Sequence, residues 1–263
     1  MPAVALTIAG SDPSGGAGIQ ADLKTFHQFG VYGMSVIAVL TVQNTEGVTS
    51  VDPLDPAYVE AQLRAVTEDI PPNAAKTGAL GTAAIIETVA LWAETIAFPL
   101  VVDPVMVSKH GASLLGEDAA AALREKLLPR AALVTPNLAE AAALSGMDVH
   151  DISSMERAAR HIATFGCGAV LVKGGHLDTH PADLLLIDGE VEILQSPRIE
   201  TRHTHGTGCT LSAAITAGLA KGDSLAQAVR TAKAFIARAI MTAPGLGHGS
   251  GPVNHHASLD GLV

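Results

Sequence analysis

The chain has 263 residues, of which 48% are hydrophobic and 16% are charged. This length and apolar content suit one large domain with a sizeable core, and no linker, repeat or low-complexity tract interrupts the sequence, so we expect a single domain over residues 1–263. The formal net charge of -10 argues against a nucleic-acid partner, because non-specific binding to phosphate backbones depends on clustered lysine and arginine.

Cysteine content and the N-terminal sequence bear on the compartment. Cys167 and Cys209 are the only cysteines, which is too few for a disulfide framework and is typical of a reducing compartment. The first ten residues lack the basic region of a secretory signal, and no apolar run approaches the roughly 18 residues that a membrane span needs. These features predict a soluble, cytoplasmic protein with no membrane partner.

The first segment predicts a strand, a glycine-rich loop and a helix, over residues 3–9, 10–18 and 19–29. Within it, Gly16-Ala17-Gly18-Ile19-Gln20-Ala21 fits the dinucleotide-binding pattern G-x-G-x-x-A, so a Rossmann-type oxidoreductase is an alternative. In that fold the glycines begin where the strand ends, whereas here residues 10–15 intervene. The next predicted strand, 34–42, also ends in Gln43-Asn44 instead of the acid that holds a ribose. Both details disfavour the dinucleotide interpretation.

Further along, apolar strand-like runs alternate with segments of helical spacing. The later predicted strands are 74–80, 100–102, 133–135 and 168–173. The predicted helices are 58–70, 82–96, 117–127, 138–144, 155–165, 210–220 and 226–241. Asp188-Gly189 is a turn signal that joins 183–187 to 191–194 as an antiparallel hairpin. Strands separated by helices of this length predict an α/β fold, with a mostly parallel central sheet covered by helices on both faces.

Ligands of such a sheet bind beyond the carboxyl ends of its strands, where several polar side chains are expected. These side chains are Asp12, Asp22, Gln43, Asn44, Asp103, Asn137, Glu140 and Lys173, with Lys76 inside a strand. Asp103 and Glu140 could orient Mg²⁺ through water while Lys173 neutralises phosphate oxygens, an arrangement typical of phosphoryl transfer without a Walker A loop. As an alternative, Asn137 and Glu140 could simply be a helix-capping pair.

The segment His203-Thr204-His205-Gly206-Thr207-Gly208-Cys209-Thr210 has the pattern of a loop that becomes a helix. Gly206 and Gly208 flank Thr207 and allow the backbone to approach a bound group, while the helix N-terminus presents unpaired N–H groups to an anion. Cys209 lies at this anion hole, where a helix N-terminus is expected to lower the pKa of a thiol. The alternative is a turning loop with a packed cysteine.

Long motifs in the chain closely resemble the hydroxymethylpyrimidine/phosphomethylpyrimidine kinase family. They are Ala5-Leu6-Thr7-Ile8-Ala9-Gly10-Ser11-Asp12-Pro13-Ser14-Gly15-Gly16-Ala17-Gly18-Ile19-Gln20-Ala21-Asp22-Leu23-Lys24, Gln43-Asn44-Thr45, Thr135-Pro136-Asn137-Leu138-Ala139-Glu140-Ala141, Lys173-Gly174-Gly175-His176, the segment 203–212 and Gly247-His248-Gly249-Ser250-Gly251-Pro252-Val253. The resemblance covers essentially the whole chain. It implies a ribokinase-like fold, usually dimeric, that phosphorylates 4-amino-5-hydroxymethyl-2-methylpyrimidine and then its monophosphate from MgATP, for thiamine biosynthesis.

The resemblance also implies roles for individual residues. It places the pyrimidine pocket at Gly10, Asp22, Gln43, Ala79 and Val105. We expect the nucleotide at Asn137, Lys173, Thr207 and Gly208, catalysis at Cys209, Gly206, Gly208 and Lys173, and the metal at Asp103 and Glu140. Gln43 suits the pocket because a carboxamide offers a donor beside an acceptor, which matches the amino group and neighbouring ring nitrogen of an aminopyrimidine.

Two other functions remain open at this point. Pyridoxal kinase is the nearer alternative, because its substrate also carries a hydroxymethyl group on a six-membered heteroaromatic ring. A non-catalytic nucleotide- or vitamin-binding module is the other, although such a module would need neither Cys209 nor a metal pair beside the anion hole. The alanine-rich, apolar composition and the habit of the family both favour a homodimer, the commonest soluble oligomer.

Overall fold

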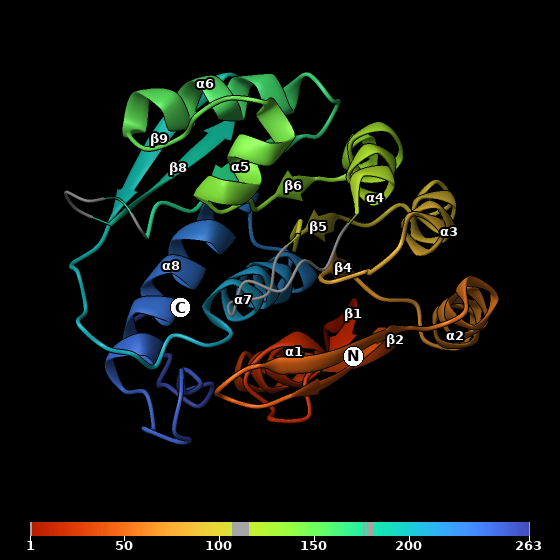
Figure 1. Ribbon diagram of the computed structural model, residues 1–263, viewed down its shortest axis with the longest axis horizontal. Helices are drawn as coiled ribbons and strands as arrows, with labels where there is room; N and C mark the ends of the chain where they lie inside the picture. The colour runs from red at the N-terminus through yellow and green to blue at the C-terminus, as the bar shows by residue number, and fades with distance from the viewer. Residues whose placement is uncertain (1, 107–115, 176, 178–180, 263) are drawn as a thin grey trace.

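In the computed structural model, which describes residues 2–106, 116–175, 177 and 181–262, nine strands form one sheet (Figure 1). The strands are β1 (Val4–Ser11), β2 (Tyr32–Gln43), β3 (Val48–Pro53), β4 (Ala74–Thr77), β5 (Leu100–Val102), β6 (Leu133–Val134), β7 (Ala169–Val172), β8 (Ala182–Ile187) and β9 (Glu190–Gln195). The α-helices are α1 (Gly18–Gln28), α2 (Pro56–Asp69), α3 (Ala83–Ala93), α4 (Glu117–Ala122), α5 (Leu138–Ser145), α6 (Ile152–Ala163), α7 (Thr207–Lys221) and α8 (Leu225–Met241).

The strands follow the order β3-β2-β1-β4-β5-β6-β7-β8-β9. Strands β2, β1, β4, β5, β6 and β7 pair in parallel, while β3 and β8 are antiparallel to their inner neighbours. The predicted late hairpin is β8–β9, and Asp188 and Gly189 take the positive φ angles of 52° and 81° that a tight two-residue hairpin turn requires. The α/β fold with a mostly parallel sheet is therefore confirmed.

Strand β3 was not predicted, because its side chains are half-buried or exposed and it ends in Pro53, so it lacks an apolar face to signal a strand. Its turn from β2 is built by Asn44, whose Oδ1 accepts hydrogen bonds from the backbone N–H groups of Glu46 (2.8 Å) and Gly47 (3.1 Å). The ribbon of β2 and β3 forms one edge of the sheet.

Two helices, α6 and α7, start three residues before the predicted positions. Helix α7 begins at Thr207 and not at residue 210, since Gly206 serves as its N-cap with a φ of 78°. Helix α6 begins at Ile152 and not at residue 155, because Asp151 and Ser154 form a capping box. The predicted helix 117–127 is divided into α4 and a π-helical turn, Leu123–Leu127.

Helices cover both faces of the sheet, as the apolar strands require. Leu6 and Ile8 of β1 belong to the core on the side of α2 to α6, whereas Ala5 belongs to the core that contains residues of α1, α7 and α8. Figure 1 shows α1, α7 and α8 together on one side of the sheet, opposite α2, α3 and α4. Among the helices of the described residues, none is long and apolar enough to cross a membrane.

Candidate active site

Asp103 and Lys173 form a buried ion pair at the carboxyl ends of β5 and β7. Lys173 Nζ lies 2.8 Å from Asp103 Oδ1, which also accepts a hydrogen bond from the Thr135 hydroxyl at 3.1 Å. Burial acts to raise the pKa of Asp103, but Lys173 and Lys76 hold it below the ordinary value for aspartate. Burial acts to lower the pKa of Lys173, but Asp103 and Glu140 hold it above its ordinary value. Both groups are therefore charged at neutral pH.

Asn137 and Glu140 begin helix α5 beside this pair. The Asn137 side chain accepts a hydrogen bond from the Glu140 N–H (2.9 Å), and Glu140 Oε2 accepts one from the Asn137 N–H (2.7 Å), so the capping interpretation is confirmed. The same Glu140 oxygen lies 4.0 Å from Lys173 Nζ. Burial raises the pKa of the Glu140 carboxyl to about 7, and Asp103 adds to this effect while Lys173 opposes it. The cap thus holds Glu140 against the charged pair.

The N-terminus of α7 points its backbone at Lys173. Gly206 must be glycine there, because a Cβ on it would lie 1.7 Å from the Gly16 carbonyl oxygen, in addition to the positive φ angle. A Cβ on Gly208 would lie 3.3 Å from Lys173 Nζ, so the helix backbone itself borders the lysine. The N–H groups of Gly208 and Cys209 are in the first turn, where the helix offers them no acceptor. This geometry is compatible with the predicted anion hole, and its binding of a phosphate stays a prediction.

Thr207 is the first residue of α7, and its side chain is engaged within the loop before the helix. Its hydroxyl donates a hydrogen bond to the Thr204 carbonyl oxygen at 2.7 Å, which closes the turn before the helix. Its N–H lies 3.3 Å from the same oxygen. The contact of Thr207 with a nucleotide therefore stays a prediction.

The predicted low pKa of Cys209 is wrong. Burial raises the pKa of the Cys209 thiol to about 11. Lys76 and a hydrogen bond from the Gly18 backbone lower it, whereas the carboxylates of Asp22 and Asp103 raise it further. Desolvation near two carboxylates thus outweighs the helix N-terminus, and the thiol is protonated at neutral pH. The position of Cys209 at the first turn of α7 is as expected.

Asp22 and Lys76 form a second ion pair beneath the thiol, and both are fully buried. Lys76 Nζ lies 3.0 Å from each Asp22 oxygen, and the Thr7 hydroxyl donates to Oδ2 at 2.6 Å. Burial raises the pKa of Asp22 above its ordinary value, and Asp22 holds the pKa of Lys76 above its own ordinary value against the opposing effect of burial. Both Asp22 oxygens are engaged, which indicates that Asp22 holds Lys76 under the site. Its predicted contact with the pyrimidine stays untested.

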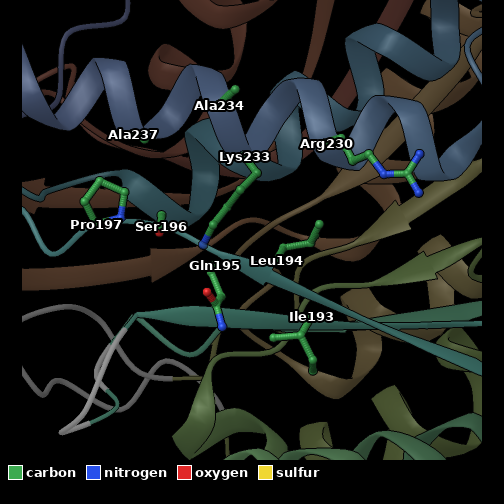
Figure 2. Close-up of a pocket in the computed structure, with 9 residues that line it drawn as sticks. All are labelled: Ile193, Leu194, Gln195, Ser196, Pro197, Arg230, Lys233, Ala234 and Ala237. Atoms are coloured by element: carbon green, nitrogen blue, oxygen red, sulfur yellow. The ribbon is translucent and has the colours of Figure 1, made fainter.

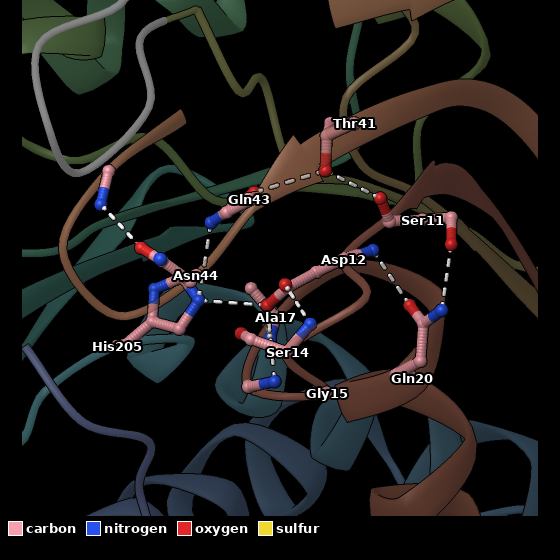
Figure 3. Close-up of polar contacts among 12 residues, drawn as sticks. Ser11, Asp12, Ser14, Gly15, Ala17, Gln20, Thr41, Gln43, Asn44 and His205 are labelled. Atoms are coloured by element: carbon pink, nitrogen blue, oxygen red, sulfur yellow. Dashed lines mark hydrogen bonds and ion pairs between the residues drawn. The ribbon is translucent and has the colours of Figure 1, made fainter. Parts of the chain in front are cut away.

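The remaining predicted pocket residues lie around the ends of β1 and β2. A Cβ on Gly10 would lie 3.7 Å from the Ala79 Cβ, so these two residues border the same space. Gln43 ends β2 beside His205 and Thr41 (Figure 3). The N–H of Val105 bonds to the Asp103 carbonyl oxygen at 2.9 Å, which places Val105 next to the ion pair. Gly10 and Ala79 thus border one space and Val105 lies next to the ion pair, while the contact of these residues and of Gln43 with a pyrimidine stays a prediction.

Two polar groups of the site had no assigned role in the sequence analysis. Lys76 is one of the largest fully buried side chains, and the signal for it was a lysine inside an otherwise apolar strand. His205 is 3% exposed, and its Nε2 lies 2.8 Å from Asp12 Oδ2. Nothing in the sequence pairs residues that are 193 positions apart, so this contact depended on the fold. His176 of the Lys173 motif lies outside the described residues.

The acidic residues suit magnesium held largely through water. Asp103 and Glu140 supply carboxylate oxygens, the ligands that Mg²⁺ prefers, and Mg²⁺ commonly binds through one or two carboxylates together with substrate phosphates. A site built from protein ligands alone is not present in the described residues, where no cluster of three or more His, Cys, Asp or Glu could hold a metal. The donor set therefore fits a metal that arrives with a nucleotide.

A separate pocket of about 400 Å³ lies between β9 and α8 (Figure 2). Its lining includes Arg230 and Lys233 from α8 and Gln195 from β9. Lys233 Nζ lies 2.5 Å from Asp183 Oδ2, and Asp183 Oδ1 accepts a hydrogen bond from the Gly174 N–H at 2.9 Å. Asp183 thereby links this pocket to the turn that follows Lys173.

The geometry agrees with what comparison shows. A family model described as phosphomethylpyrimidine kinase matches residues 12–254. The hydroxymethylpyrimidine/phosphomethylpyrimidine kinase of Streptomyces coelicolor is 50% identical over 259 residues, which cover 98% of this chain and 96% of that relative. The chain belongs to the phosphomethylpyrimidine kinase family. Membership in this family removes the dinucleotide-binding oxidoreductase as an explanation of the glycine-rich loop.

Solved structures of other vitamin kinases share the fold of this phosphomethylpyrimidine kinase family member. An ADP complex of Bacillus subtilis pyridoxal kinase matches with a TM-score of 0.91 at 44% identity, covering 98% of each chain. A Staphylococcus aureus pyridoxal kinase in complex with AMP-PCP and pyridoxal matches with a TM-score of 0.89 at 39% identity, covering 98% of this chain and 95% of that one. The ribokinase-like α/β fold is confirmed, and similar chains bind adenine nucleotides.

Proposed function

We propose that the protein is an ATP-dependent kinase that phosphorylates 4-amino-5-hydroxymethyl-2-methylpyrimidine and then its monophosphate, to give the diphosphate for thiamine biosynthesis. The observation that carries the proposal is the match to phosphomethylpyrimidine kinases over nearly the whole chain. It is supported by the convergence of an anion hole, a charged lysine and two carboxylates at one end of the sheet.

The nucleotide side of the site is formed by α7, Lys173 and α5. The N–H groups of Gly208 and Cys209 and the charge of Lys173 would stabilise the negative charge that spreads over the transferred phosphoryl oxygens. Asn137 holds the start of α5 and with it Glu140, opposite Lys173. Asp103 and Glu140 would hold Mg²⁺ through its water shell, close to the phosphates of ATP. Magnesium, when bound, would neutralise charge on the phosphate oxygens of ATP.

The pyrimidine side is formed by the ends of β1 and β2 with Ala79 and Val105. Gln43 would pair with the amino group and ring nitrogen of the substrate, while Gly10 leaves room for the ring. In the first step the hydroxymethyl oxygen attacks the γ-phosphorus of ATP, ADP leaves, and the hydroxyl proton must be removed. In the second step the attacking oxygen belongs to a phosphate that is already ionised, so no base is needed.

In this proposal the attacking oxygen and the phosphoryl group meet beside Cys209, at the N-terminus of α7. Because its pKa is about 11, only a small fraction of Cys209 is thiolate at neutral pH, and this scarce thiolate is the form that would accept the hydroxyl proton in the first step. A neutral thiol carries no charge that would repel the monophosphate in the second step. A permanent carboxylate at this position would repel it.

Pyridoxal phosphorylation is the second candidate function. The structural similarity to pyridoxal kinases is the observation that favours it, with TM-scores of 0.91 and 0.89. Assays of ADP release with hydroxymethylpyrimidine, its monophosphate and pyridoxal, run side by side, separate the two functions. The proposal expects turnover of both pyrimidines with a higher kcat/KM than for pyridoxal. Turnover of pyridoxal alone would establish the second function, and binding of ATP without turnover of any substrate would establish a binding module.

We further propose that the protein is a cytoplasmic homodimer. Both cysteines are free, in agreement with a reducing compartment that supplies ATP. The edge ribbon exposes apolar side chains at the end of β2, where Leu40 is 44% and Val42 is 60% exposed. These side chains favour association with a second copy of the chain.

A further inference from the structure

The Gln43 side-chain amide lies between two groups whose hydrogen-bonding roles can be deduced. As placed, Gln43 Nε2 lies 3.3 Å from His205 Nε2, and Gln43 Oε1 lies 3.4 Å from Thr41 Oγ1 (Figure 3). A rotation of the amide by 180° exchanges its nitrogen and oxygen without changing its shape. The orientation must therefore follow from which neighbours donate and which accept.

His205 Nε2 must carry a hydrogen. It lies 2.8 Å from Asp12 Oδ2, and the same carboxylate accepts hydrogen bonds from the N–H groups of Ser14 and Ala17, both at 2.8 Å. Burial acts to raise the pKa of Asp12, but the hydrogen bonds from His205 and Ser14 lower it to about 2. An ionised carboxylate can only accept, so His205 Nε2 donates whether the ring is neutral or protonated.

Thr41 Oγ1, in contrast to His205 Nε2, must accept a hydrogen bond from Gln43. The Thr41 hydroxyl donates its single hydrogen to the Ser11 carbonyl oxygen at 2.8 Å, so Thr41 Oγ1 presents a lone pair to Gln43. If the amide NH₂ faced His205, two donors, the NH₂ and the His205 Nε2–H, would face each other. If the amide oxygen faced Thr41, two acceptors, that oxygen and Thr41 Oγ1, would face each other. Rotating the amide removes both conflicts: its oxygen can then share the His205 Nε2 hydrogen with Asp12 in a three-centre hydrogen bond, and its NH₂ donates to Thr41 Oγ1.

We propose that His205, held by Asp12, and Thr41 are positioning residues that lock the Gln43 amide with its oxygen toward His205 and its NH₂ toward Thr41. The proposal rests on the proposed role of Gln43 in pyrimidine recognition. Each end of the amide keeps one further hydrogen-bonding position for the substrate. The amide oxygen accepts from the exocyclic amino group on the His205 side, and the NH₂ donates to the ring nitrogen on the Thr41 side.

The lock determines which ring patterns the site accepts. In the 4-oxo counterpart, 5-(hydroxymethyl)-2-methylpyrimidin-4(3H)-one, the amino donor becomes an acceptor and the ring nitrogen becomes a donor. A freely rotating Gln43 amide could rotate by 180° to pair with this reversed pattern, whereas a locked amide cannot. Since a bidentate pair of this kind discriminates by about 5- to 150-fold, we expect a preference for the amino compound in that range.

Kinetics of four variants test the lock. Thr41→Val and His205→Phe each remove one of the two constraints, and Thr41→Val does so with little change of side-chain volume, so the ratio of kcat/KM for the amino over the oxo compound should fall toward one. Thr41→Ser restores the hydroxyl and should restore the ratio. Thr49→Val is the matched control, since the Thr49 hydroxyl bonds to the Val42 carbonyl oxygen on the neighbouring strand and should not affect the ratio. An unchanged ratio in Thr41→Val would overturn the lock.

Gln43→Ala separates the lock from the proposed recognition. If this variant leaves the KM for the pyrimidine unchanged, Gln43 does not bind the ring and the proposed pocket is wrong. If it raises that KM while Thr41→Val and His205→Phe keep the wild-type ratio, recognition stands and the lock alone is wrong.

Neutron diffraction from deuterium-exchanged crystals shows the orientation of the Gln43 amide without any substrate, because the oxygen and the ND₂ group then differ in nuclear density. The expected map has ND₂ beside Thr41 Oγ1, and a deuteron on His205 Nε2. An ND₂ group facing an undeuterated His205 Nε2 would overturn the proposal.

Discussion

Gln43 is the residue on which ring recognition depends most directly. Replacing it with alanine leaves donor and acceptor atoms of the buried ring without partners, which costs about 1–3 kcal/mol. We expect Gln43→Ala to raise the KM for hydroxymethylpyrimidine accordingly while the KM for ATP hardly changes. Steady-state kinetics with each substrate varied in turn provides the measurement. An equal loss for ATP would show that Gln43 belongs to the nucleotide side.

At the same scale, the raised pKa of Cys209 predicts how the two chemical steps depend on pH. A thiol with a pKa of about 11 stays protonated to high pH, so the thiolate fraction rises tenfold per pH unit between pH 7 and 10. If the thiolate removes the hydroxymethyl proton, the first phosphorylation should accelerate over this range, whereas the second should not. Rates of each step, measured separately across this pH range, test the dependence.

Cys209→Ala provides the matching comparison. If the scarce thiolate acts as the base, its loss should slow the first step and remove its rise with pH, with little effect on the second step. Cys209→Asp should keep the first activity and depress the second, because a permanent charge repels the monophosphate. Equal losses of both steps in Cys209→Ala would mean that the residue only shapes the anion hole.

At the scale of single elements, the N-terminus of α5 combines a cap with a charge. Glutamine can replace glutamate in a capping box, so Glu140→Gln should keep the Asn137 bond and the helix start. The Glu140 pKa of about 7 lies above the ordinary value of 4.5, so the ionised form is disfavoured in the folded state and its contribution to stability falls as pH rises from 4.5 through 7. Glu140→Gln should therefore be at least as stable as the wild type at pH 8.

The same substitution should raise the Mg²⁺ concentration needed for half-maximal activity, because one carboxylate of the water-mediated site is gone. Magnesium titrations and thermal unfolding of Glu140→Gln at pH 8 measure the two effects together. An unchanged magnesium dependence with a lowered melting temperature would assign Glu140 to capping alone.

Helix α7 offers a matched pair of glycines at its two ends. Gly206 has a φ of 78° and would place a Cβ 1.7 Å from the Gly16 oxygen, whereas Gly222 has a φ of 93° with nothing within 4 Å. Gly222→Ala should cost only the left-handed backbone, about 1–2 kcal/mol of unfolding free energy, and keep full activity. Gly206→Ala should cost more and abolish activity, since the loop must move off Gly16. Urea denaturation gives the unfolding free energy of both variants, and steady-state kinetics gives their kcat. Equal losses of stability and activity in Gly206→Ala and Gly222→Ala would contradict the proposed role of Gly206 in the anion hole.

At the scale of the whole molecule, the exposed apolar side chains of β2 predict where two copies meet. Light scattering at assay concentration should give twice the chain mass. Val42→Lys should lower the measured mass toward that of the monomer, because the substitution places a charge in the proposed interface. Leu91→Lys is the control: Leu91 is 65% exposed on α3 and should leave the mass unchanged. A monomeric wild-type protein would refute the dimer.

The order of strands and helices could be predicted from the sequence because each buried strand is an apolar run and each helix has a regular apolar spacing. β3 could not be predicted, since its half-exposed side chains are held by pairing with β2 and not by burial. The start of α7 was placed too late, since glycines weaken a helix signal and Gly206 caps the helix through its backbone alone.

The polar residues of the site could be named from the sequence because they follow strand ends, but their electrostatics could not. The pKa of Cys209 depends on Asp22 and Asp103, which only the folded sheet brings near the thiol. The same holds for His205 and Asp12, whose contact fixes the surroundings of Gln43. Burial and long-range partners decide these properties, and neither is visible in local spacing.

The central claim is that one site carries out two successive phosphorylations of the pyrimidine. The most direct test follows a single reaction of hydroxymethylpyrimidine with excess MgATP by ³¹P NMR. The account predicts that the monophosphate appears first and is then converted to the diphosphate, with two ADP formed per pyrimidine. A monophosphate that accumulates and persists while ATP remains, or no phosphorylated pyrimidine at all, would contradict it.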